Sequence, residues 1–175
     1  MSKDMLHEPR YFDNVRALLE WGAEYYGNDT VYSFRPTPRA DVVKKSFVEF
    51  RDDVRALASE LLSMGCAGRH CVVIGKLSYE WAALYYATLS IGGVLIPLDR
   101  DWQAEDLAAT VERAEAKFLF CDADIAEKAD FIKNSCNLKS SPFFIGESAE
   151  ESFIPDFGEG GRGAALRSVL TEENA

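Results

Sequence analysis

Residues 71–98 have the sequence CVVIGKLSYEWAALYYATLSIGGVLIPL, and its order of apolar and capping residues indicates the fold class. Two apolar runs, 71–75 and 94–98, predict buried strands. Between them Ser78 can cap a helix over 79–91, which is apolar nearly all round and therefore needs cover on both sides. Gly92 and Gly93 end that helix. A strand, a helix and a second strand in this order predict a βαβ unit with parallel strands.

The same alternation continues toward the C-terminus. Asp101 can cap a helix whose inner face carries Leu107, Val111 and Ala114, and residues 118–121 form a third apolar run. A helix over 125–132 and a strand at 143–145 follow. Strands that are apolar on both faces are typical of parallel sheets covered by helices. We therefore predict an α/β fold in which 71–75, 94–98 and 118–121 lie side by side, point the same way and are covered on both faces.

The first part of the chain predicts a helix over 12–26 and a hairpin made of strands at 31–34 and 42–47. Ser46 and Glu49 have the spacing of a capping box, and a helix with one apolar face runs on to Leu62 before Gly65 ends it. Four basic residues lie on the hairpin: Arg35, Arg39, Lys44 and Lys45. We interpret them as a solvated edge that prevents pairing with other strands, because nothing else supports a phosphate site there.

Residues 1–145 are predicted to form the α/β subdomain. Residues 146–175 are predicted to form an acidic, glycine-rich loop that ends in a short helix over 164–170. Gly158 to Gly163 satisfies the G-x-G-x-x-G pattern, but no clear buried strand precedes it, so we interpret it as a loop and not as a dinucleotide site.

The composition limits the function classes. A net charge of −10 argues against a nucleic-acid surface and against docking on an anionic membrane through a basic patch. No stretch approaches the roughly 20 apolar residues that cross a bilayer, and the first residues lack the apolar segment of a signal peptide. We expect a cytoplasmic protein whose four cysteines are reduced thiols. These are Cys66, Cys71, Cys121 and Cys136.

Candidate functional residues follow two of the predicted strands. Lys76, Ser78, Glu80 and Trp81 follow the first, and Asp99, Arg100 and Asp101 follow the second. Ligands bind at the carboxyl ends of strands in open α/β sheets, so both groups are candidates for a site. Helix capping and first-turn charge explain these residues more simply than a ligand site does, and we favour that interpretation.

A metal site at Cys66, His70 and Cys71 is not expected. A structural zinc ion needs four ligands, and the only other histidine of the chain is His7. We interpret these three residues as a turn that leads into a core strand.

Several stretches resemble AMP-forming acyl-CoA synthetases, most closely the bacterial long-chain fatty-acid–CoA ligases. The resemblance covers roughly residues 11–133 and rests on residues 45–50, 54–75, 78–81, 91–99, 105–107 and 116–120. Its most specific part is Ser78-Tyr79-Glu80-Trp81 together with residues 91–99. The chain departs from the family pattern at Lys76-Leu77, at Gly92-Gly93 and at Arg100.

The resemblance implies a parent enzyme that joins a fatty acid or another carboxylate to coenzyme A through an acyl-adenylate, with ATP and Mg²⁺. It also implies that the phosphate loop, the adenine and ribose motifs and the catalytic lysine come later in the family's chain, and none of them occurs in residues 1–175. We therefore assign no catalytic, cofactor-binding or metal residue. We expect this segment alone to be inactive and to self-associate through uncovered apolar surface.

Two alternatives stay open at this point. One is a stand-alone interaction module that kept the scaffold without catalysis. The other is an unrelated nucleotide-binding domain with flavodoxin-like winding, which binding of a flavin or nicotinamide cofactor would favour.

Overall fold

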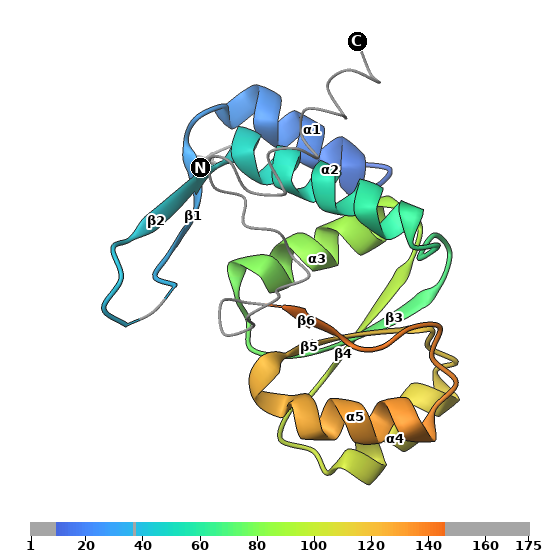
Figure 1. Ribbon diagram of the computed structural model, residues 1–175. Helices are drawn as coiled ribbons and strands as arrows, with labels where there is room; N and C mark the ends of the chain where they lie inside the picture. The colour runs from blue at the N-terminus through green and yellow to red at the C-terminus, as the bar shows by residue number, and fades with distance from the viewer. Residues whose placement is uncertain (1–9, 37, 146–175) are drawn as a thin grey trace, which may run out of the picture.

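The computed structural model describes residues 10–36 and 38–145 and contains a four-stranded parallel sheet (Figure 1). Its strands are β3 (His70–Ile74), β4 (Val94–Leu98), β5 (Phe118–Asp122) and β6 (Phe143–Ile145). The order across the sheet is β4-β3-β5-β6, and each neighbouring pair is parallel. The predicted parallel alignment of the three apolar runs is thus confirmed, with β3 between the other two. The prediction that 94–98 is buried is wrong, because β4 lies at one edge of the described sheet, where only Leu95 is buried and Val94 is 44% exposed.

Helices cover both faces of this sheet. They are α2 (Phe47–Ser63) and α3 (Tyr79–Ser90) on one face, and α4 (Ala104–Arg113) and α5 (Ala126–Ser135) on the other. The connection from β3 to β4 runs in the opposite direction from the connection between β4 and β5. Right-handed crossovers in opposite directions place their helices on opposite faces, which explains why α3 and α4 are separated.

Each strand contributes alternate residues to two separate cores. In β3, Cys71 and Val73 pack with α2 and α3, whereas Val72 and Ile74 pack with α4 and α5. All four side chains are fully buried. Burial on both faces explains why all four residues from Cys71 to Ile74 are apolar and not every second one.

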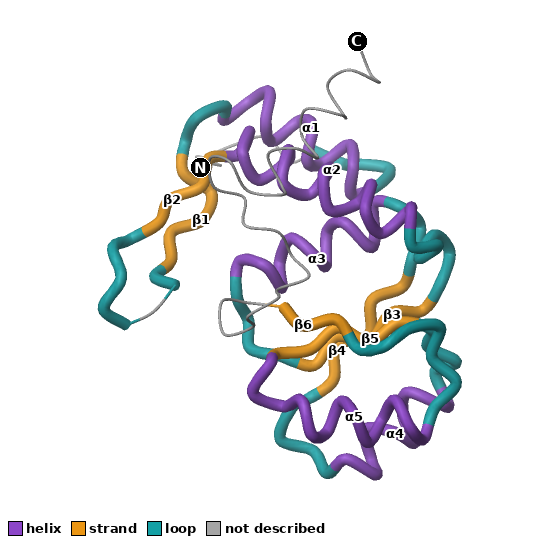
Figure 2. The backbone as a smooth tube through the Cα atoms, viewed as in Figure 1, coloured by secondary structure: helices purple, strands orange, loops and turns teal. Residues whose placement is uncertain are grey.

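The N-terminal helix and the hairpin lie on the α2 side of the molecule. They consist of α1 (Val15–Tyr26), β1 (Thr30–Phe34) and β2 (Val43–Ser46). The two strands pair antiparallel, with Tyr32 opposite Lys45, and the hairpin extends away from the four-stranded sheet (Figure 2). The Ser46 hydroxyl accepts a hydrogen bond from the Glu49 amide, and the Glu49 carboxylate accepts one from the Ser46 amide. The predicted capping box is therefore present and joins β2 directly to α2.

A buried ion pair attaches the hairpin to the helical layer. The Lys45 ammonium lies 2.9 Å from a carboxylate oxygen of Asp53, which is completely buried in α2. The Tyr79 hydroxyl donates to the same oxygen at 2.6 Å. The prediction that the basic residues of the hairpin are all solvated is thus wrong for Lys45, whose side chain is only 13% exposed. Arg35 instead donates to the carbonyl of Ala40 within the hairpin loop.

Three helix predictions need correction. The first helix begins at Val15 with Asn14 as its cap, three residues later than predicted, because the Asn14 side chain accepts from the Ala17 amide. Asp101 does not cap α4, since its own amide donates to Asp99 and Gln103 occupies the cap position without a side-chain bond. One side of α3 is only partly covered, with Trp81 half-buried.

Other local predictions are confirmed. Gly65 adopts a φ of 81° just after α2, a conformation that favours glycine, and Cys71 and Cys121 are fully buried. No helix within the described ranges is long and apolar enough to span a bilayer. The predicted loop over 146–163 and helix over 164–170 lie outside the described residues.

Candidate functional site at the carboxyl edge of the sheet

The strand order creates a topological switch point between β3 and β5. The chain leaves β3 toward β4 on one side, and after β4 it crosses back to β5 on the other side. Loops diverge at such a point, and in open α/β sheets ligands bind in the crevice between them. The residues that follow Ile74, Leu98 and Asp122 are therefore the first place to look for a site.

The loop after β3 passes very close to the end of β5. A Cβ atom on Gly75 would lie 2.5 Å from the Oδ1 atom of Asp122, so any other residue here would force the Asp122 carboxylate to shift. The next amide, that of Lys76, donates a hydrogen bond of 2.9 Å to the Oδ2 atom of Asp122. The Asp122 carboxylate thus ties the end of β5 to the backbone of the loop after β3.

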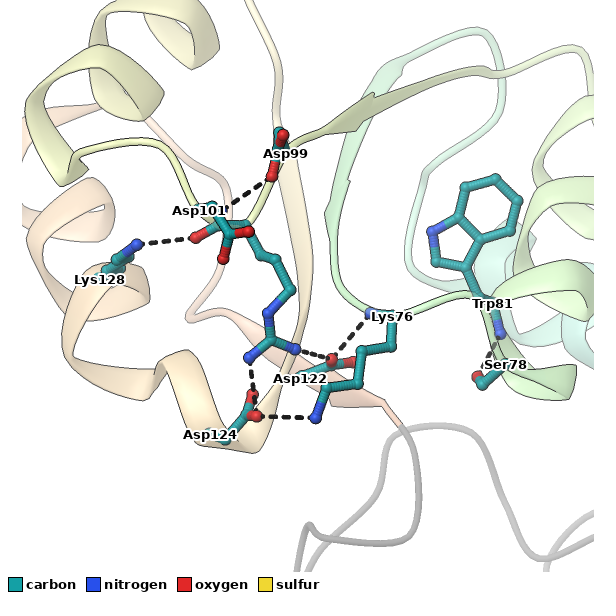
Figure 3. A network of polar contacts seen from close by, with 9 residues as sticks. Lys76, Ser78, Trp81, Asp99, Asp101, Asp122, Asp124 and Lys128 are labelled. Atoms are coloured by element: carbon teal, nitrogen blue, oxygen red, sulfur yellow. Dashed lines mark hydrogen bonds and ion pairs between the residues drawn. The ribbon is translucent and has the colours of Figure 1, made fainter. Parts of the chain in front are cut away.

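Four charged side chains then join the three strand ends in one ion network, made of Lys76, Arg100, Asp122 and Asp124 (Figure 3). The Arg100 guanidinium lies 2.8 Å from Asp122 and 2.7 Å from Asp124, one nitrogen to each carboxylate. The Lys76 ammonium lies 3.2 Å from Asp124. The network links residues after β3, β4 and β5, and its two positive and two negative charges balance.

The two carboxylates respond differently to this setting. Burial raises the pKa of Asp122, although the Lys76 amide and the Arg100 guanidinium oppose part of that rise. The hydrogen bond from Arg100 lowers the pKa of Asp124, whose side chain is 42% exposed. The same hydrogen bond raises the pKa of Arg100. The Arg100 guanidinium therefore compensates the charge of two carboxylates, the mostly buried one of Asp122 and the more exposed one of Asp124.

A lysine from α5 fixes the loop between β4 and α4. The Lys128 ammonium donates to the carbonyls of Arg100 at 2.7 Å and Trp102 at 2.8 Å. In the same loop the Asp99 carboxylate accepts from the Asp101 amide at 2.9 Å. These contacts hold the backbone that carries Arg100, so the guanidinium is positioned from both ends.

The structure separates the predicted site residues into two groups. It brings Lys76 and Arg100 together at the switch point, whereas Ser78 caps α3 by accepting from the Trp81 amide at 3.1 Å. Trp81 stacks on Tyr85 with ring centres 5.7 Å apart. Glu80 lies in the first turn of α3. The capping interpretation is therefore confirmed for Ser78.

Sequence reasoning missed three residues of the network and its support: Asp122, Asp124 and Lys128. One signal was available, because Asp122 directly follows the apolar run 118–121 and had to lie at the same edge as Lys76 and Arg100. The position of Lys128, on a helix packed below this edge, had no comparable signal.

The arrangement supports the strand ends and does not resemble a phosphate cradle. Lys76 and Arg100 are already bonded to carboxylates, and the Lys128 ammonium is bonded to two backbone carbonyls. His70, considered above as a metal ligand, contacts the Ala114 carbonyl through Nδ1 at 2.6 Å. Within the described residues, no group of three or more His, Cys, Asp or Glu side chains is placed to hold a metal ion. Among residues 10–36 and 38–145, the side chains at this edge therefore do not fit the Mg²⁺ and nucleotide that the resemblance implies.

Sequence comparison finds relatives among acyl-CoA ligases. FadD15 of Mycobacterium bovis, a long-chain-fatty-acid–CoA ligase, is 35% identical over 77 residues, which are 43% of this chain. The medium-chain acyl-CoA ligase ACSF2 of Danio rerio is 25% identical over 99 residues, or 55% of this chain. The matched segments cover only 13% and 16% of these two relatives, so the chain corresponds to a small part of their length.

Solved structures share the fold. FadD1 of Archaeoglobus fulgidus, a long-chain-fatty-acid–CoA ligase, superposes with a TM-score of 0.67 and 18% identity over 81% of this chain and 29% of its own. The N-terminal domain of FACL13 from Mycobacterium tuberculosis gives a TM-score of 0.61 and 19% identity over 75% of this chain and 31% of its own.

A family description matches most of the chain. Residues 19–153 match the family described as AMP-binding enzyme. The strand order is also that of flavodoxin-like domains, but the family match excludes an unrelated domain of that kind. The chain thus belongs to the AMP-binding enzyme family and corresponds to the N-terminal part of its acyl-CoA ligases.

Proposed function

We propose that this chain is the N-terminal scaffold of an ATP-dependent fatty-acid–CoA ligase. In such an enzyme a carboxylate oxygen attacks the α-phosphorus of ATP, which gives an acyl-adenylate and releases pyrophosphate. The thiol sulfur of coenzyme A then attacks the acyl carbon, loses its proton and displaces AMP. The family match over residues 19–153 and the similarity to a long-chain ligase support this proposal.

The scaffold part of the proposal rests on one observation. At the switch point, where a sheet of this topology would bind a ligand, the Arg100 guanidinium is bonded to Asp122 and Asp124, which compensate its charge. The described residues therefore hold strand ends in place, and the adenylation chemistry requires groups outside them. We infer that this segment alone does not form an adenylate.

The test compares the purified 175-residue chain with the complete product of its gene. Palmitate-dependent exchange of pyrophosphate into ATP measures adenylate formation, and mass spectrometry of palmitoyl-CoA with quantification of AMP measures the whole reaction. We expect both activities in the complete product and neither in the 175-residue chain. Exchange by this chain would overturn the scaffold role. A complete product that forms no thioester, or that releases ADP, would overturn the ligase assignment.

A further inference from the structure

We draw no further inference here: the strongest candidate, the half-open apolar hollow where α1, β1, α2 and α3 meet, carries nothing because no contact among the described residues shows what occupies it.

Discussion

Replacing Lys45 by methionine should destabilise the protein far more than the same replacement at its neighbour Lys44. Methionine keeps most of the unbranched apolar side chain but removes the charge 2.9 Å from Asp53, whose carboxylate is 0% exposed. Removing one partner of a buried ion pair costs about 3–5 kcal/mol because the other charge stays in a poorly hydrated site. Lys45 itself is 13% exposed, so we expect the lower end, about 3 kcal/mol.

The free energy of unfolding is measured by urea denaturation with circular dichroism, and the thermal midpoint of K45M should fall by about 6–12 °C. Lys44 lies on the exposed side of β2, so Lys44→Met is the control and should change stability by less than about 0.5 kcal/mol. Adding Asp53→Asn to K45M should recover part of the loss, since asparagine keeps an acceptor for Tyr79 without a charge. Equal losses in K45M and K44M would refute the role of the buried pair.

Four more predictions follow from the sheet edge and the cores. Gly75→Ala should cost about 1–3 kcal/mol in urea denaturation, because its Cβ would collide with Asp122. Arg100→Met should cost about 1–2 kcal/mol at neutral pH. Burial raises the pKa of Asp122 in the folded state, so protonation of Asp122 favours the folded state. The difference in unfolding free energy between R100M and the parent should therefore shrink as the pH falls toward 3.8. A difference that stays constant with pH would contradict this. Iodoacetamide should modify half-buried Cys136 first, as peptide mass mapping would show, because Cys121 is buried with a pKa raised to about 12; early labelling of Cys121 would contradict that burial. Light scattering over a concentration series should detect self-association of the chain, and a monomer throughout would contradict the uncovered apolar surface.

The sequence predicts the sheet well because its signals are local. Residues 71–74 and 118–121 are uninterrupted apolar runs and are buried, whereas the equally apolar run 94–98 lies at a sheet edge and is mostly not buried. The helices between the strands begin or end at residues with clear conformational preferences, such as Ser78 and Gly65. Right-handed connections then leave few ways to arrange the strands. Strand direction and helix placement therefore follow without any information on tertiary contacts.

Side-chain partners that are distant in sequence were the part that could not be predicted. Lys45 resembles its solvated neighbours, and only the packing of β2 against α2 shows that it faces Asp53. Asp101 has the residue type of a cap, but the turn after β4 directs its amide to Asp99 and moves the helix start onward. Both errors arose where a tertiary contact or a tight turn competed with a local preference.

The switch point shows how a ligand site and a structural clamp can look alike in sequence. Both place lysine, arginine and aspartate just after buried strands, so residue type alone does not separate them. The difference is the charge balance: a phosphate site needs cations in excess, whereas Lys76 and Arg100 here face Asp122 and Asp124 in equal number. Since Asp122 also bonds the backbone of the β3 loop, an incoming phosphate would have to displace a carboxylate held by two groups. At this edge the charges therefore hold the three strand ends together.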